Sequence, residues 1–301
     1  MSQVVVCIDD KGKPANIPDL EMIITRSFDE RDRQATATNT SGVRIDLDKR
    51  SDLDVSSIWV KSGRDITMGE ANMQRFVAEY LQNNNISAVR APRVYLAFTW
   101  GIFGFIVTEY IDGQTCSYSD ISVVAAAVQA LIDIRSPSLK PGPVGGGLME
   151  HPFFVDRKSC IQYESVEELQ DHVNGILSET GRRGRVNFAS ELANYGLRLC
   201  VSDLVPVNFM KDSNGGIVAV DFGGYSFLPP SFFAFTLRYG GCSNFALRVA
   251  RTLEYPSPPN VTAMVSASCA LVPFSRNDVG LPERLQSRLQ PVNAAHNRPS
   301  A

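Results

Sequence analysis

The pattern of apolar residues changes partway along this chain, and the change restricts the folds open to it. In roughly the first 110 residues, apolar residues occur in short β-branched and aromatic runs, which are typical of strands. Beyond that point they recur mainly at helical spacing, as from 119 to 135, where Pro137 ends the pattern. Strands followed by helices predict an α+β fold, with a small β-rich lobe joined to a larger helical lobe.

The individual elements follow from these runs and from the turn-forming residues between them. Trp100–Gly104 predicts the turn of a hairpin, and Thr67 with Glu70 has the spacing of a capping box at the start of a helix. Predicted strands cover 4–8, 22–25, 43–47, 58–61, 93–98, 105–110, 207–210 and 217–220. Predicted helices cover 68–82, 119–135, 165–178, 188–198, 244–252 and 261–271.

The change of pattern near residue 111 marks the expected boundary between the two lobes. We expect an N-terminal lobe over 1–111, a C-terminal lobe over 112–281, and a polar, disordered tail over 282–301. The length of 301 residues suits one large domain or two lobes of this kind.

Composition and charge exclude several classes of function. A net charge of −3 and a pI near 5.7 argue against a surface for nucleic acid or for an anionic membrane, since both need clustered positive charge. The six cysteines are scattered without a CxxC pair, which favours free thiols over a zinc site or a disulfide framework. No run approaches the ~18–20 apolar residues of a membrane span, and the N-terminal apolar run is too short for a signal peptide. We therefore expect a cytoplasmic protein, while the oligomeric state is not indicated by the sequence.

Three oxygen-bearing side chains lie around one predicted hairpin. Asp203 lies on a loop, Asn208 follows shortly, and Asp221 ends the second strand of a ribbon that turns at Asp212–Gly216. A hairpin brings its two ends together, so an amide oxygen and a carboxylate can converge there. Phosphoryl transfer needs a carboxylate to orient and deprotonate the attacking hydroxyl, and hard oxygen ligands to hold Mg²⁺ on the phosphates. The spacing predicts this chemistry.

Each of the three side chains also has a purely structural interpretation. Asp203 fits a turn or a cap, Asn208 fits an Asx-turn, and Asp221 before Phe222 and two glycines fits the end of a strand. The functional hypothesis depends on all three residues occurring together, in this order and at this spacing.

The ordered set of motifs resembles the aminoglycoside phosphotransferase and protein kinase superfamily, and most closely its fungal aminoglycoside phosphotransferase-like members. The similarity extends over roughly residues 55–235. Its segments are Ile58–Lys61, Gly69–Ala71, Arg90–Tyr95, Thr108–Gly113, Ser202–Asn208 and Val220–Pro230. The resemblance implies a bilobal protein kinase-like fold, with the N-terminal lobe binding nucleotide.

For the nucleotide, the resemblance implies that Lys61 contacts the α- and β-phosphates of ATP and that Glu70 pairs with Lys61 and holds it. It implies that Glu109 and Ile111 offer backbone groups to adenine at a hinge between the lobes. Taken from the residues alone, Lys61 also fits a solvated strand end, and Glu70 fits a helix cap with Thr67.

For the reaction, the resemblance implies that Asp203 is the general base and that Asn208 and Asp221 bind Mg²⁺. The expected function is ATP- and Mg²⁺-dependent transfer of phosphate to a hydroxyl of a small-molecule acceptor, with no nucleic-acid or membrane partner. The acceptor itself cannot be read from the sequence.

The sequence departs from the family pattern in three places. Val201 stands where the family usually has a histidine, the loop 36–42 carries a single glycine where a glycine-rich loop is expected, and no A-P-E segment is present. Two alternatives therefore stay open: a kinase-fold pseudoenzyme or nucleotide-binding module without phosphoryl transfer, and an enzyme that uses the same lobes for nucleotidyl transfer.

The remaining conspicuous residues fit structural interpretations. His151, His172 and His296 are not expected to be catalytic, because they fall in a loop, on an amphipathic helix and in the tail. The aromatic run Phe232–Phe235 is expected in the core, and the glycines 145–147 in a flexible turn, since no Lys-Ser/Thr follows them.

Overall fold

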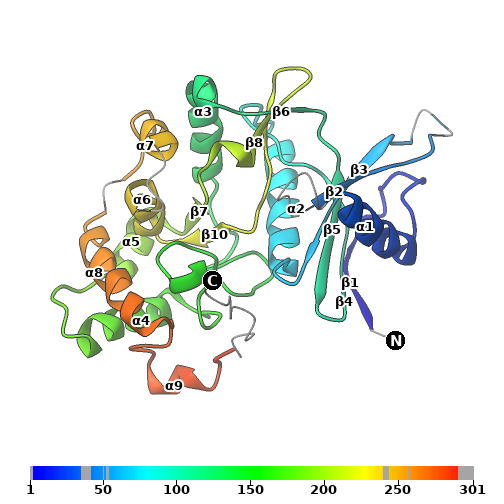
Figure 1. Ribbon diagram of the computed structural model, residues 1–301. Helices are drawn as coiled ribbons and strands as arrows, with labels where there is room; N and C mark the ends of the chain where they lie inside the picture. The colour runs from blue at the N-terminus through cyan, green and yellow to red at the C-terminus, as the bar shows by residue number, and fades with distance from the viewer. Residues whose placement is uncertain are drawn as a thin grey trace, which may run out of the picture.

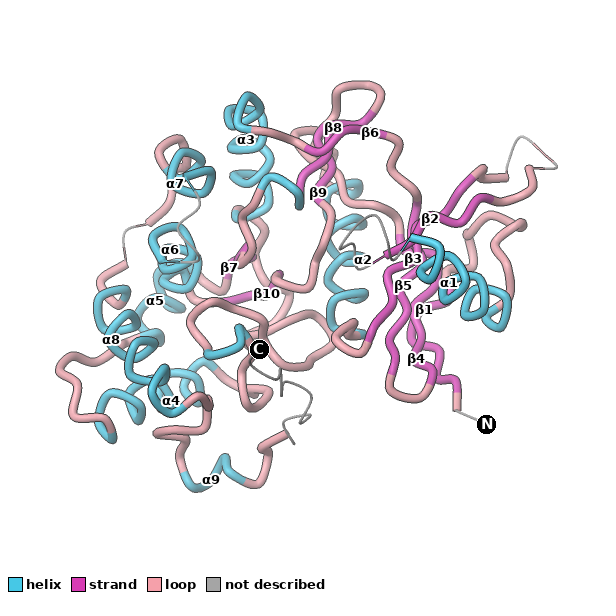
Figure 2. The backbone as a smooth tube through the Cα atoms, viewed as in Figure 1, coloured by secondary structure: helices cyan, strands magenta, loops and turns pink. Residues whose placement is uncertain are grey.

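The computed structural model describes residues 3–34, 42–49, 51, 54–239, 244–256 and 258–290. A sheet-rich N-terminal part lies beside a larger part that consists mainly of helices (Figures 1 and 2). The predicted α+β architecture, with a small β-rich lobe and a larger helical lobe, is confirmed. Within the described residues, no helix combines the length and the apolar character that crossing a membrane requires.

The N-terminal lobe is built on one antiparallel sheet of five strands in the order β1-β4-β5-β3-β2. The hairpin predicted around Trp100–Gly104 is present as the turn between β4 and β5. The strands are β1 Val4–Asp9, β2 Gly42–Asp46, β3 Ser57–Gly63, β4 Val94–Trp100 and β5 Phe103–Glu109.

Helix α1 (Leu20–Gln34) lies on one face of this sheet, where its apolar side joins a core of strand residues. The strand predicted over 22–25 is wrong, because these residues belong to α1. A short β-branched run suggested a strand, but Ile23 and Ser27 are both buried at helical spacing, and Asp19 accepts a hydrogen bond from the Met22 N–H at the helix start.

Helix α2 (Met68–Asn83) covers the opposite face and lies between the sheet and the helical lobe, packing against both (Figure 1). Ala71 packs against the sheet, whereas Val77 lies in the core of the helical lobe. The backbone just before α2 approaches the sheet closely: a Cβ added to Gly104 would lie 2.1 Å from the Ile66 carbonyl oxygen. This contact fixes the start of α2 relative to β3 and β5.

The C-terminal lobe packs its helices around an aromatic core. The run Phe232–Phe235 lies in this core as predicted, with Phe232 and Phe233 fully buried. The helices are α3 Ile121–Ile132, α4 Val166–Glu179, α5 Phe188–Tyr195, α6 Pro230–Tyr239, α7 Asn244–Ala250, α8 Val261–Leu271 and α9 Glu283–Gln286. Short 3₁₀ turns cover Tyr118–Asp120, Val155–Arg157, Pro206–Asn208 and Val272–Phe274.

Two small sheets support the segments that carry the predicted site. The hairpin of β8 (Phe209–Asp212) and β9 (Ile217–Ala219) is present as predicted and is joined by β6 (Gly113–Thr115). A second sheet pairs β7 (Arg198–Val201) with β10 (Tyr225–Leu228).

Neither β7 nor β10 was predicted, and the predicted helix over 188–198 extends too far. Gly196 has a φ of 69°, which ends α5 at Tyr195 and lets the chain turn into β7. The result is that β7 leads directly into the Asp203 loop.

Two sequence predictions fall partly outside the described residues. Of the loop 36–42, only Gly42 is described, as the first residue of β2. The tail predicted from 282 begins with the short helix α9, and residues 291–301 lie outside the described part of the chain.

Candidate active site

Lys61 on β3 joins two carboxylates from different lobes. Its Nζ lies 2.5 Å from Glu70 Oε1 on α2 and 2.8 Å from Asp221 Oδ1, which follows β9. The Lys61 and Glu70 side chains are 13% and 4% exposed, and that of Asp221 is 43% exposed. The structure therefore brings together three of the residues singled out in the sequence.

Glu70 serves two functions with different atoms. Its backbone N–H donates to Thr67 Oγ1 at 3.1 Å, so Thr67 caps α2 as the sequence predicts. Its carboxylate is directed to Lys61 and does not return to the cap. The structure therefore has the ion pair of Glu70 with Lys61, whereas Thr67 caps the helix without a reciprocal bond from the Glu70 carboxylate.

One lysine faces two carboxylates in this partly buried cluster. Burial opposes the charged form of Lys61, but Glu70 and Asp221 outweigh it and raise the lysine pKa. Burial also raises the pKa of Glu70, with Lys61 acting against it and Asp221 adding to it. Lys61 therefore carries its positive charge at neutral pH and points it toward the exposed carboxylate of Asp221.

Asp203 and Asn208 interact directly. Asn208 Nδ2 donates to both Asp203 Oδ2 and the Asp203 backbone carbonyl, each at 2.9 Å. Asn208 is buried, and its amide is fixed by these two bonds. Because the amide nitrogen is used in this way, the amide oxygen of Asn208 is directed elsewhere.

Backbone hydrogen bonds attach the Asp203–Asn208 loop to the segment that carries Asp221. The Val220 N–H donates to the Asn208 carbonyl at 2.9 Å, and the Ser202 N–H donates to the Gly224 carbonyl at 2.9 Å. A Cβ added to Gly224 would lie 3.4 Å from Asp203 Cβ, so the two segments are in close contact. The three oxygen-bearing side chains of the sequence analysis thus belong to one hydrogen-bonded unit.

Asp221 itself adopts an unusual backbone conformation, with a φ of 64°. A non-glycine residue in this left-handed region costs on the order of 1–3 kcal/mol and persists only where the surroundings determine it. Here Lys61 and the Gly223 N–H both bind Asp221 Oδ1, which fixes the side chain. The conformation aims the carboxylate at the lysine.

Two oxygen atoms at the site, Asn208 Oδ1 and Asp221 Oδ2, are of the kind that binds Mg²⁺. In the described part of the chain, no hydrogen-bond donor contacts Asn208 Oδ1 or Asp221 Oδ2. Mg²⁺ prefers hard oxygen ligands and is commonly held by one or two protein groups together with phosphates and water. No group of three or more His, Cys, Asp or Glu side chains among the described residues is arranged for a metal ion, so an ion here would depend on this smaller set.

Glu109 and Ile111 lie on the segment that leads from β5 into the helical lobe. The Glu109 carboxylate accepts from Arg90 Nη1 at 3.0 and 3.1 Å, and its backbone N–H donates to Arg93. Ile111 is nearly buried, and its backbone N–H and carbonyl have no hydrogen-bond partner within the described ranges. Of the two predicted hinge residues, Ile111 therefore has backbone groups to offer a ligand, whereas the N–H of Glu109 is already used.

Two charged residues at the site were not singled out in the sequence. Arg157 Nη2 lies 3.1 Å from Asp203 Oδ1. Glu150 Oε2 lies near Gly223: a Cβ added there would be 3.5 Å from it and from carboxylate oxygens of Glu70 and Asp221. Burial raises the pKa of Glu150, Arg157 lowers it and Asp221 raises it. Both come from a region without a recognisable motif, so no local pattern in the sequence distinguishes them.

The two described histidines lie in the core. His151 bonds to the Phe232 carbonyl and the Phe153 N–H, and burial lowers its pKa to about 3. His172 bonds to the Tyr163 hydroxyl, and burial lowers its pKa to about 4. Among the described residues, neither forms a hydrogen bond with a predicted site residue, and His296 lies outside the described residues.

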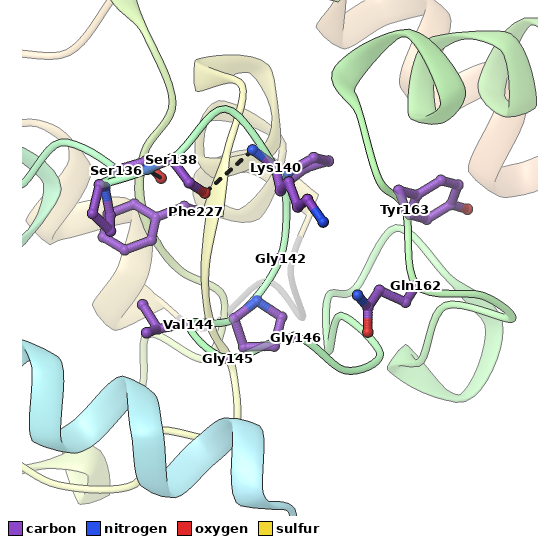
Figure 3. Close-up of a pocket in the computed structure, with 13 residues that line it drawn as sticks. Ser136, Ser138, Lys140, Gly142, Val144, Gly145, Gly146, Gln162, Tyr163 and Phe227 are labelled. Atoms are coloured by element: carbon purple, nitrogen blue, oxygen red, sulfur yellow. Dashed lines mark hydrogen bonds between the residues drawn. The ribbon is translucent and has the colours of Figure 1, made fainter.

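A cavity of about 310 Å³ lies elsewhere in the helical lobe (Figure 3). The segment from Ser136 to Gly146 forms most of its wall, with Gln162, Tyr163 and Phe227 completing it. None of the predicted site residues lines this cavity.

Comparison with known proteins gives matches among solved structures only. No protein-family model and no curated protein matches this chain, and the expected closer likeness to fungal members finds no support. A choline kinase from Streptococcus pneumoniae matches with 15% identity and a TM-score of 0.40, covering 83% of this chain and 90% of the other. An aminoglycoside phosphotransferase from Streptomyces rimosus, in complex with ADP and streptomycin, matches with 13% identity and a TM-score of 0.38, covering 86% and 99%.

A thermostable aminoglycoside phosphotransferase mutant in ternary complex with ADP and hygromycin B matches with 12% identity and a TM-score of 0.46, covering 80% of this chain and 88% of the other. The present chain itself combines a five-stranded antiparallel sheet, a helix that packs against both the sheet and the second lobe, and a lysine–glutamate pair between them. This is the α+β arrangement of a small β-rich lobe and a larger helical lobe that the sequence predicts.

Proposed function

We propose that this chain is an ATP- and Mg²⁺-dependent phosphotransferase that acts on a hydroxyl of a small molecule. One observation carries the proposal: Lys61 Nζ lies 2.8 Å from Asp221, and backbone bonds attach Asp221's segment to the Asp203–Asn208 loop. A cation for phosphates, oxygen ligands for a metal and a carboxylate for proton removal therefore lie in one unit. Phosphoryl transfer requires these three functions together.

ATP binds between the lobes in this proposal. The charged Lys61, held by Glu70, neutralises the phosphates, and the backbone groups of Ile111 receive the adenine ring. Lys61 lies on β3, and its strand neighbour β5 leads into the hinge segment, so both contacts belong to one side of the interlobe region. Bound Mg²⁺, held by Asn208 Oδ1 and Asp221, supplies charge neutralisation on the phosphate oxygens.

Asp203 then acts on the acceptor. Its carboxylate orients the acceptor hydroxyl and takes its proton as the oxygen attacks the γ-phosphorus. The bond from the acceptor oxygen to phosphorus forms while the bond from phosphorus to the β,γ-bridging oxygen breaks, and ADP leaves. Each carboxylate oxygen of Asp203 accepts one side-chain hydrogen bond from the described residues and keeps a lone pair for the hydroxyl.

Thermal unfolding with and without nucleotide tests the binding half of this proposal. Mg-ATP at about 100 times its Kd is expected to stabilise the protein by about 2.7 kcal/mol, because ligand binds only the folded state. Lys61→Met is expected to lose most of this gain, because the phosphates lose their cation. A melting temperature unchanged by Mg-ATP in the unaltered protein contradicts the proposal.

Product analysis separates the alternatives that the sequence left open. The proposal expects ADP and a phosphorylated acceptor after incubation with Mg-ATP and a hydroxyl-compound library. AMP attached to an acceptor would assign nucleotidyl transfer, and stabilisation by Mg-ATP without any product would assign a pseudoenzyme.

A further inference from the structure

Asp203 is held from two sides, and one of the two contacts comes from far away in the sequence. Asn208, from the same loop, binds Asp203 Oδ2 at 2.9 Å. Arg157 Nη2 binds the other carboxylate oxygen at 3.1 Å and the Ser202 carbonyl at 3.2 Å. With a donor on each oxygen, the carboxylate plane cannot rotate freely about its bond to Cβ.

The backbone that carries Arg157 is both strained and firmly held. Asp156 and Arg157 have φ values of 51° and 59°, so two successive non-glycine residues adopt the left-handed conformation. Each costs on the order of 1–3 kcal/mol, and such residues persist only where neighbouring bonds determine them. The Arg157 carbonyl accepts from the His151 N–H at 2.7 Å.

Asn277, from a distant segment, completes this support. Its side chain accepts from the Val155 N–H at 2.8 Å and donates to the carbonyls of Val155 and Lys158 at 2.9 and 2.8 Å. The turn that presents Arg157 is thus bonded on both sides of the arginine. These bonds hold the turn in place, and the turn holds the Arg157 guanidinium against Asp203.

The free energy of folding gained from the Arg157–Asp203 ion pair is too small to explain the strained turn that presents Arg157. Arg157 and Asp203 are 37% and 39% exposed, and exposed ion pairs contribute about 0–1 kcal/mol. That gain does not offset the cost of two left-handed residues. A planar guanidinium with fixed donors is, however, well suited to orient a carboxylate.

We propose that Arg157 is a positioning residue that fixes the carboxylate of Asp203 for proton abstraction, an inference that rests on the proposed phosphotransferase function. Arg157 acts through Asp203, and Asn208 opposes it from the other side. A base aligned before the acceptor arrives loses little freedom in the transition state, whereas misplacement by about 1 Å costs up to about 100-fold in rate.

Steady-state hydrolysis of Mg-ATP, with water as the acceptor, tests this inference. Water attacks the γ-phosphorus, its proton passes to Asp203, and ADP and inorganic phosphate are released. Arg157→Ala is expected to lower kcat by about 10- to 100-fold while KM for Mg-ATP changes less than about twofold, because Lys61 and the metal ligands remain. Arg157→Lys is expected to recover only part of the rate, because lysine lacks the planar fork.

Chemical rescue distinguishes positioning from a structural role. Guanidinium ion at low, non-denaturing concentration is expected to restore part of the Arg157→Ala rate in a saturable way, and to restore none in Asp203→Asn. Arg288→Ala is the matched control, since Arg288 is similarly exposed (32%) and pairs with Glu168 away from the site. It is expected to retain full activity.

The outcomes separate this inference from the proposed function. If Asp203→Asn abolishes hydrolysis but Arg157→Ala retains it, the positioning role is wrong and the phosphotransferase stands. A lowered melting temperature with no guanidinium rescue assigns Arg157 a structural role and also overturns the inference. If the unaltered protein neither binds nor hydrolyses Mg-ATP, the proposed function fails, and the positioning role fails with it.

Discussion

Asp203→Asn is expected to lower the rate of Mg-ATP turnover by about 10²- to 10⁴-fold, the usual contribution of a general base. The substitution keeps the size and shape of the side chain but removes the carboxylate that we propose accepts the proton. Asn208 and Asp221 are untouched, so Mg-ATP is still expected to raise the melting temperature of the variant. The measurement is ADP formation under saturating Mg-ATP, with thermal unfolding of the same sample.

Asp133→Asn provides a closely matched control for this experiment. Asp133 accepts from Arg198 Nη1 at 3.1 Å, as Asp203 accepts from Arg157 at 3.1 Å, but it ends α3 away from the site. We expect this variant to keep its full rate. Full turnover in Asp203→Asn, or an equal loss in both variants, contradicts the assignment of Asp203 as the base.

Acidification is expected to destabilise the fold below about pH 6.5 because two histidines are buried in their neutral form. Burial lowers the pKa of His151 to about 3 and that of His172 to about 4. Below the unfolded pKa near 6.5, the unfolded chain therefore binds protons that the folded chain does not. Stability is lost as pH falls, by about 2 kcal/mol for each histidine at pH 5. The loss continues until the folded pKa values are reached.

Buried carboxylates change the stability of the fold with pH in the opposite direction to the histidines. Burial raises the pKa of Glu70, Glu150 and Glu191, so acid relieves part of the cost of burying their charges. As pH falls through these raised pKa values, the three carboxyl groups therefore offset part of the loss of stability that the histidines cause.

Urea unfolding at pH 7, 6 and 5 and constant ionic strength measures this dependence. His172→Asn is expected to be less stable at pH 7, because it loses the bond to Tyr163, and to show a shallower fall in stability with acid. The two proteins are compared by how steeply the free energy of unfolding changes with pH, which does not depend on the variant's stability at pH 7. A fall in stability with acid that is as steep in His172→Asn as in the unaltered protein contradicts the burial of a neutral His172.

The parts of the fold with strong local signals were predictable from the sequence. Thr67 and the apolar period that follows it place α2 within a residue of its observed end, and Asp212–Gly216 places the β8–β9 hairpin. The same local signals placed Lys61 on a strand and Glu70 on the next helix. Because β3 and α2 are adjacent in the chain, their pairing follows from short-range geometry.

The predictions that were wrong or missing concern segments whose structure depends on contacts with distant parts of the chain. The β-branched residues at 22–25 resemble a strand until the sheet beneath α1 is known, and β7 forms only because β10 lies beside it. Arg157 was missed for the same reason. Its contact with Asp203 depends on a left-handed turn bonded to Asn277, and no local pattern marks that turn.

A crystal structure with Mg²⁺ and a non-hydrolysable ATP analogue tests the central claim most directly. The claim predicts adenine at the backbone of Ile111, phosphate oxygens at Lys61, a metal ion bound by Asn208 Oδ1 and Asp221, and the γ-phosphate facing Asp203. A nucleotide bound elsewhere, or a metal ion that contacts neither Asn208 nor Asp221, would contradict it.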